Sequence, residues 1–477
     1  MKPIVHRFSI REPEQARAHG LRAGPFTVAL LFWAGVLTVA LLFCADAAAP
    51  EIDLHGTVVK RTLYRVPIVV EDFAIEASPG ERNDPLFFSG GERPEDLLVQ
   101  DLRFSDAFQV VRRRQGSFDP AGEPPRDIDG ALVEQPIQAR VVGRMEWDDE
   151  RLRLKAELID QGTGNRILDR EVAINREGEL ARPDRWAIHR LSDEITRYLT
   201  GTPGCAATRI AFLRESRSGK ELFLVDWDGY EEQAVTGLGT ILVSPAWHPS
   251  GERIAFTSYH RGAPVLVALD LESRRLATLS TAPTPAAAVY SPNGKRVAFS
   301  TTAEGDAELY VARADGSHAR RLTFHPDIDT APCWSPSGER LVFTSDRCGR
   351  PQLFLIDADG SNLQQLTFSG EWNDSPDWSP AGSRIVHVCQ IGGRFELALI
   401  DVQGFGWRRL TVGGGCENPR WAPDGRHVVF ALTQAGVRNL WILDADSGNL
   451  RQLTASPDHS YNPGWSRPAR ERIRASG

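Results

Sequence analysis

Residues 333–343 read Cys333-Trp334-Ser335-Pro336-Ser337-Gly338-Glu339-Arg340-Leu341-Val342-Phe343. This stretch has the pattern of two short strands joined by a tight turn. Pro336 suits the first corner of a turn, and Gly338 allows the positive φ that closes it. The apolar run that ends at Phe343 fits a buried strand. The stretch recurs along the chain, and its copies decide the fold.

The repeat has a period of 43 or 44 residues, and an aromatic residue heads each copy. The six residues are Trp247, Tyr290, Trp334, Trp378, Trp421 and Trp465. In the first five copies Pro and Gly follow at fixed offsets, then a buried strand and a third strand that ends at a polar turn. A fourth strand ends in Leu-Thr at residues 322, 366, 410 and 453. Four strands in each repeat are typical of a β-propeller blade.

The two ends of the repeat region are incomplete and complement each other. Trp465 has no turn and no buried strand after it, whereas the buried strand at 209–212 has no Trp strand before it. Joined, the two fragments make one blade. Five whole blades and this shared blade predict a six-bladed ring at 204–468, and the pairing leaves no open sheet edge.

Residues 50–203 predict a separate α/β domain. Helices are expected at 94–102 and 185–199, and strands at 65–70, 108–111, 137–145, 152–159 and 167–174. The last three strands form an antiparallel meander, and the acids at 148–150 mark a solvated turn rather than a metal site. The fold class is therefore an α/β amino-terminal domain followed by an all-β six-bladed β-propeller.

Residues 1–49 predict an export signal. Five basic residues precede the uncharged run 26–43, and small residues lead to Ala49, where we expect cleavage. The run is also long enough to span a bilayer, so a retained signal anchor is the alternative. Either outcome places the remainder in an exported compartment. Residues 469–477 form a charged tail.

The bulk composition argues against several functions. The 477 residues carry a formal net charge of −8, which disfavours a nucleic-acid binder because such a protein needs a basic face. Six cysteines include no C-x-x-C pair, and no nucleophile elbow, H-E-x-x-H, P-loop or Rossmann motif is present. The sequence therefore predicts no catalytic, cofactor or metal site. His387, which replaces an aromatic residue of the other blades, is expected to be a core histidine with satisfied hydrogen bonds.

The order of these elements resembles the TolB family, the periplasmic propeller proteins of the Tol-Pal system. The likeness rests on residues 51–56, 66–73, 101–108, 189–195, 199–201 and 209–212, together with the repeats. It implies a non-enzymatic periplasmic adaptor that supports outer-membrane integrity and cell division. The implied partners are a Pal-like lipoprotein at the propeller mouth and a TolA-like inner-membrane protein at the mature amino terminus. We expect a monomer.

The propeller mouth is expected where loops enter the innermost strands, just before the aromatic positions. The candidate contacts there are Thr284, Asp329, Thr330, Asn373, Asp374, Ser375, Glu417, Asn418, Tyr461 and Asn462. At the mature amino terminus the candidates are Glu51, Ile52 and Asp53. Acids, amides and Tyr suit a hydrated protein contact. The alternatives are a propeller-based periplasmic hydrolase or lyase and an inner-membrane-anchored scaffold.

Overall fold

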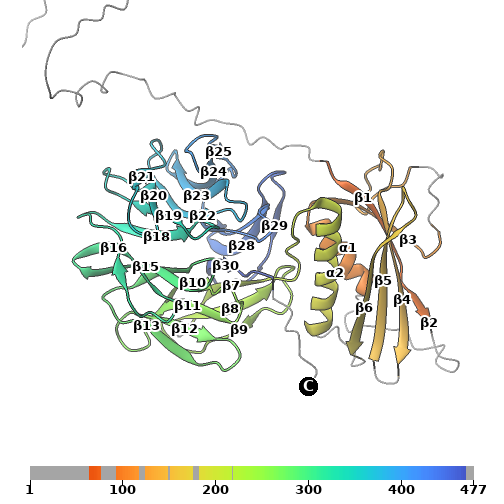
Figure 1. The fold of residues 1–477 in the computed structure, drawn as a ribbon, viewed down its shortest axis with the longest axis horizontal. Helices are drawn as coiled ribbons and strands as arrows, with labels where there is room; N and C mark the ends of the chain where they lie inside the picture. The colour runs from red at the N-terminus through yellow and green to blue at the C-terminus, as the bar shows by residue number, and fades with distance from the viewer. Residues whose placement is uncertain are drawn as a thin grey trace, which may run out of the picture. The chain divides into compact units, whose positions relative to one another are not determined.

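The structure, a computed structural model, describes residues 64–76, 93–117, 124–148, 151–175, 182–217 and 219–468. All of them lie in one compact unit, Asp53–Gly477. The described residues form two helices, one six-stranded sheet and six four-stranded sheets. Figure 1 shows the helices beside the larger sheet and the smaller sheets arranged as a ring. The fold class predicted from the sequence is therefore confirmed. The expected signal, the mature amino terminus and the charged tail lie outside the described residues.

Within its described residues, the amino-terminal domain is a six-stranded mixed sheet, and its helices α1 and α2 pack on one face of that sheet (Figure 1). Its elements are β1 (Val66–Glu71), β2 (Ala74–Glu76), α1 (Pro94–Phe104), β3 (Phe108–Arg113), β4 (Ala139–Asp148), β5 (Arg151–Asp160), β6 (Arg166–Asn175) and α2 (Arg182–Thr200). The order is β3-β1-β4-β5-β6, and β2 pairs with β4. Strand β1 runs parallel to β3 and β4 and is buried along its whole length, as a central parallel strand requires.

Each blade of the propeller is a four-stranded antiparallel sheet. The first sheet combines β30 (Ser460–Trp465), β7 (Arg209–Ser216), β8 (Gly219–Asp226) and β9 (Gln233–Ala234). The next three are β10 (Leu242–Trp247), β11 (Arg253–Ser258), β12 (Val265–Asp270) and β13 (Leu276–Ser280); β14 (Ala286–Tyr290), β15 (Arg296–Glu304), β16 (Asp306–Arg313) and β17 (Arg320–Arg321); and β18 (Asp329–Trp334), β19 (Arg340–Ser345), β20 (Gln352–Asp357) and β21 (Gln364–Gln365). The last two are β22 (Asn373–Trp378), β23 (Arg384–Ile391), β24 (Arg394–Asp401) and β25 (Arg408–Arg409); and β26 (Cys416–Trp421), β27 (His427–Gln434), β28 (Val437–Asp444) and β29 (Leu450–Gln452).

The ring closes by pairing strands that are distant in the sequence. Strand β30 pairs antiparallel with β7, and Trp465 lies opposite Ile210. The Trp465 indole Nε1 donates a hydrogen bond to Thr208 Oγ1 at 2.7 Å, and Arg209 N donates to Ser466 Oγ at 2.9 Å. The shared blade inferred from the two incomplete repeats is the one observed.

The aromatic residue of each repeat is a packing element between neighbouring blades. Trp334 is 4% exposed, and its indole Nε1 donates to the Val289 carbonyl of the preceding blade at 3.2 Å. The guanidinium of Arg296, the first residue of β15, lies 4.6 Å from the centre of the Trp334 ring. Arg340 and Arg384 lie in the same way over Trp378 and Trp421. An Arg at the start of the second strand thus stacks on the next blade's Trp.

Helix α2 leads into the propeller through a short connection that its own side chains fix. The Asp193 carboxylate accepts hydrogen bonds from the backbone of Ala206 and Ala207 at 2.7 and 3.0 Å. The buried Asp101 pairs with His189 at 2.7 Å and accepts a bond from the Trp227 indole at 3.2 Å. No described helix is long and apolar enough to cross a membrane.

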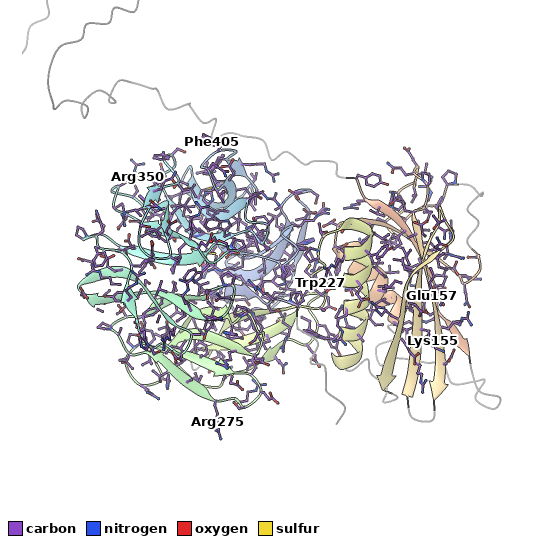
Figure 2. All side chains as sticks on the ribbon, in the orientation of Figure 1. Lys155, Glu157, Trp227, Arg275, Arg350 and Phe405 are labelled. Carbon is purple, nitrogen blue, oxygen red and sulfur yellow. The ribbon has the colours of Figure 1, made fainter. Side chains whose placement is uncertain are left out.

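Large exposed side chains lie on the periphery of the propeller. Figure 2 shows Arg275, Arg350 and Phe405 pointing outward from its edge, and Phe405 is 73% exposed. The same view shows Lys155 and Glu157 on strand β5 of the amino-terminal sheet. Lys155 pairs with Glu146, and Glu157 pairs with Arg166. Such exposed ion pairs make this face of the sheet polar and add little to the stability of the protein.

Candidate functional site

Each innermost strand of the propeller contains a β-bulge at the same position. In all six sheets the pairing with the second strand shifts register there. One residue of each bulge has a left-handed φ, between 47° and 53°: Ser244, Ala287, Ala331, Ser375, Asn418 and Asn462. A bulge bends its strand and redirects a side chain. Here all six residues line one central channel.

The channel has a volume of about 630 Å³. Five of the predicted mouth residues line it: Thr330, Asp374, Ser375, Asn418 and Asn462. The other residues of the bulge ring are small, and a proline follows in most strands. The lining therefore offers hydrogen-bonding groups around an opening that no large side chain of the ring fills.

Asp374 is one of two acidic residues that line the channel, and the other, Asp377, accepts hydrogen bonds from Cys333 and from the backbone of Trp421. The Asp374 Oδ1 accepts a hydrogen bond from Thr344 Oγ1 at 2.8 Å and another from the backbone N of Ser375 at 2.6 Å. These two donors fix the carboxylate in orientation. Thr284 stands apart from this group, because it is exposed and its hydroxyl is bonded to that of Thr302 at 2.6 Å.

Glu417 and Tyr461 belong to a charged cluster on one side of the mouth. Glu417, whose side chain is 40% exposed, pairs with Arg438 at 2.7 Å. The Tyr461 hydroxyl donates to Glu215 at 2.6 Å, and its ring lies between Arg438 and Lys220, at 4.7 and 4.1 Å from its centre. Burial, and then the Glu215 carboxylate, raises the pKa of Tyr461 to about 12. The phenol is therefore a fixed neutral donor rather than a titrating group.

Two predicted contact residues lie behind the mouth rather than on it. Asp329 is fully buried, and both its oxygens accept bonds from Arg347, at 3.0 and 2.7 Å. Asn373 is 2% exposed and donates to Gln352 Oε1 and to the Ser369 carbonyl. Each is the first residue of its innermost strand, where the side chain turns into the blade. Both side chains therefore hold neighbouring segments in place, and neither is exposed in this structure.

The mouth loops are held by a set of residues that the sequence pattern left unexplained. In five blades a Thr follows the fourth strand, after Leu in four of them and after Val235 in the first. This Thr accepts a backbone N–H from the third strand and donates to a polar residue near that strand's start, as Thr367 does to Gln352 at 2.7 Å. The equivalent polar residues are Glu221, Glu308, Gln352, Glu396 and Asn439. Glu221 and Glu396 also accept backbone N–H groups of the following loop. Each of these polar residues directly precedes a Leu in the sequence. This recurring pair of residues is the pattern from which their role could have been predicted.

The partner-binding residues expected at the mature amino terminus, Glu51, Ile52 and Asp53, lie outside the described residues, as does the expected cleavage site at Ala49. Their roles stay predictions. Of the predicted contact residues, the structure therefore describes only those in the propeller.

Comparison with known proteins gives a consistent result. The family model described as the TolB beta propeller domain matches residues 196–469. A Tol-Pal system protein TolB of Anaeromyxobacter dehalogenans is 44% identical over 144 residues, which are 30% of this chain and 33% of that protein. The Desulfosudis oleivorans protein of the same name is 31% identical over 272 residues, 55% of this chain and 58% of its own length. The chain thus aligns with about a third to somewhat over half of these relatives.

A solved structure extends the likeness in fold to most of the chain. The crystal structure of TolB from Acinetobacter baumannii superposes with a TM-score of 0.69 and covers 86% of this chain and 99% of its own. Its sequence identity of 23% supports the shared fold alone. The superposition covers too much of the chain to involve the propeller only, so it includes amino-terminal residues as well.

Proposed function

The chain belongs to the TolB β-propeller family, and from this membership we propose that it is a non-enzymatic periplasmic adaptor of the Tol-Pal system. It binds a Pal-like lipoprotein at the propeller mouth and a TolA-like inner-membrane protein through the residues around Glu51, Ile52 and Asp53. In this role it supports outer-membrane integrity and cell division. The observation that carries the proposal is the family match across the whole propeller.

The geometry of the mouth supports a protein partner. The bulge ring presents hydroxyl and amide groups into an open channel, and Glu417 and Tyr461 add an oriented acid and an oriented phenol beside it. Fixed polar groups with small neighbours suit a loop or chain segment that enters the channel and bonds through its backbone and polar side chains. We place the direct contacts at the channel lining and at the cluster beside it, with Thr284 at the exposed edge. The residues are Thr330, Asp374, Ser375, Glu417, Asn418, Tyr461 and Asn462.

Retention of a tagged Pal-like lipoprotein by the mature protein tests the proposal. We expect stoichiometric retention, and at least a tenfold loss when Asp374, Glu417 and Tyr461 are changed together to Ala, Ala and Phe. A matched control changes Glu339 and Asp315 to Ala. Both are exposed acids in turns at the opposite end of the strands, so the control removes charge without touching the mouth.

The possible outcomes separate the parts of the proposal. No retention of the lipoprotein by the unaltered protein would overturn the adaptor role. Retention that is equal in the triple variant and in the control would leave an adaptor but overturn the assignment of the mouth. Circular dichroism of each variant establishes that the fold is intact before binding is compared.

A further inference from the structure

The β26–β29 blade departs from the repeat at two adjoining positions. The residue that opens the second strand is Arg in five blades, at 209, 253, 296, 340 and 384, but it is His427 here. The residue before the turn glycine is Ser250, Asn293, Ser337 or Ala381 in the other whole blades, but it is Asp424 here. Both departures lie beside Cys205, which the connection from α2 to β7 brings against this blade. Because the other blades keep the repeat at these two positions, the change to Asp424 and His427 needs an explanation specific to this blade.

The three side chains converge on one point. The Cys205 thiol donates to Asp424 Oδ2 at 3.2 Å, and His427 Nδ1 lies 2.5 Å from the same oxygen. The sulfur, the carboxylate oxygen and the imidazole nitrogen all lie within 4.8 Å of one another. Cys205 is 3% and His427 is 2% exposed. Thiolate, imidazole and carboxylate are the ligand types of protein zinc sites.

The far side of the imidazole strengthens this interpretation. His427 Nε2 is buried and has no hydrogen-bond partner among the described residues, and the nearest carboxylate oxygen is Asp106 Oδ2 at 3.7 Å. A histidine that binds a metal through one nitrogen commonly directs its other N–H at a carboxylate. Asp106 is held by Arg65 at 2.7 Å and by Asn449 at 2.7 Å. It is therefore in place as an outer partner.

The local charge favours a cation. Two carboxylates, of Asp424 and Asp193, place negative charge near the Cys205 thiol. Three carboxylates place negative charge near the His427 imidazole: those of Asp424, Asp106 and Asp444. Two cations oppose them: Arg451 beside Cys205, and Arg426, which is bonded to Asp444 at 2.6 Å. Asp424 is not bonded to either guanidinium; its two oxygens receive Cys205, His427 and backbone N–H groups. The acid nearest the sulfur is thus available to a metal ion.

We propose that Cys205, Asp424 and His427 bind one zinc ion through Sγ, a carboxylate oxygen and Nδ1. The ion displaces the thiol proton and the proton on Nδ1, and both leave to solvent. Cys205 and Asp424 also line a cavity of about 630 Å³, which has room for water as a fourth ligand. The bound ion joins the connection after α2 to the β26–β29 blade. This proposal is independent of the partner proposed for the mouth.

Metal titration of the mature full-length protein tests the site, with Zn²⁺ and with Co²⁺ as a spectroscopic probe. We expect one ion per chain and a thiolate-to-cobalt charge-transfer band. Cys205→Ser should abolish the band and weaken binding by at least about 100-fold. Asp106→Asn, which alters only the outer partner, should weaken binding by about 10–100-fold.

The matched control is Cys333→Ser. Cys333 is also a buried thiol bonded to a carboxylate, Asp377, at 3.3 Å, but no histidine joins that pair among the described residues. Its loss should leave the stoichiometry and the cobalt band unchanged. His427→Arg restores the residue of the other blades, so it should fold and yet lose the site.

Three results would overturn the proposal: no stoichiometric binding by the unaltered protein, a cobalt spectrum without a thiolate band, or binding unchanged by Cys205→Ser. Thermal unfolding of every variant in the presence of a chelator shows which of them fold. If Cys205→Ser does not fold, His427→Arg decides the question alone.

Discussion

Two buried histidines in adjoining blades show how completely the surroundings decide the chemistry of a side chain. Burial lowers the pKa of His427, but the carboxylates of Asp424, Asp106 and Asp444 outweigh burial and raise this pKa to about 10. His387 is equally buried without an acid beside it, and burial lowers its pKa to about 4. The prediction of a core histidine at 387 is confirmed, but the prediction that its hydrogen bonds are satisfied is wrong. Neither ring nitrogen has a hydrogen-bond partner among the described residues.

We expect His387→Phe to stabilise the protein by about 1–3 kcal/mol at pH 7, because it removes two unsatisfied buried groups. Phe is the residue that the five other blades have at this position.

The lowered pKa of His387 also makes the stability of the protein depend on pH. As the pH falls from about 6.5 to about 4, the unfolded chain binds a proton that the folded protein does not. Stability is therefore lost over this range, by about 3 kcal/mol, and His387→Phe should remove that loss.

Urea unfolding at pH 7 and at about pH 4.5 measures both effects of the His387 substitution. The exposed His318 provides the control, because His318→Ala should leave in place the loss of stability that His387 causes at low pH. A variant at 387 that keeps the full dependence on pH would contradict this account.

The contact residues of the mouth could be predicted only in part. Thr330, Asp374, Ser375, Asn418 and Asn462 follow from their place in the repeat, because a loop that enters the innermost strand meets the channel. Sequence offers no measure of which way a side chain turns at a strand's first residue. For that reason Asp329 and Asn373 were grouped with the exposed residues although both are buried.

At the scale of elements, the sequence predicts the local turns but not the contacts between paired strands. The turn formed by Pro336 and Gly338 follows from two residues, and Gly338 has the expected positive φ of 73°. The role of Thr367 depends on Gln352, which is 15 residues away and is brought to it only when two strands pair. The β-bulges were also missed, because a bulge is a shift in register that no single residue type requires.

The turn between β16 and β17 provides a prediction about an element. Gly316 has a φ of 85°, and a Cβ there would lie 1.9 Å from the Leu279 carbonyl oxygen of the neighbouring blade. Gly262 has a φ of 81° with open space around it. We expect Gly262→Ala to cost about 1–2 kcal/mol for the backbone conformation alone. Gly316→Ala should cost about 1–3 kcal/mol more, for the displaced contact between blades.

Thermal unfolding of the two alanine variants measures the difference between those sites. Equal costs at 262 and 316 would mean that the close approach of the blades at Gly316 does not exist in solution.

At the scale of the whole molecule, the number of blades and the closure of the ring followed from two incomplete repeats. The zinc site proposed above did not. Cys205 and Asp424 are 219 residues apart, and only the closed ring brings them together. Motif spacing detects ligands that share a local segment, so the absence of a C-x-x-C pair carried no information about such a site.

Removal of β30 tests the closure. Loss of one buried Trp side chain costs about 3–5 kcal/mol. We expect deletion of residues 460–477 to lower the free energy of unfolding by more than this amount, because a whole strand is lost with Trp465. The deletion leaves β7 without its partner, and an unpaired edge strand associates with other chains, so oligomers should form. Size-exclusion chromatography and thermal unfolding measure both effects. Deletion of residues 469–477 alone is the control and should change neither; a monomeric, fully stable 460–477 deletion would contradict the closure.

The bond between Trp465 and Thr208 spans 257 residues of sequence, and this has a consequence for the kinetics of folding. A contact between such distant segments forms late, because the chain entropy lost in closing the loop comes before the stabilisation. The blades from β10 to β29 can each form from contiguous chain, while the sheet of β7, β8 and β9 waits for its fourth strand. Refolding should therefore end in a slow phase, and the interval before it is when a chaperone that recognises unpaired strands would act.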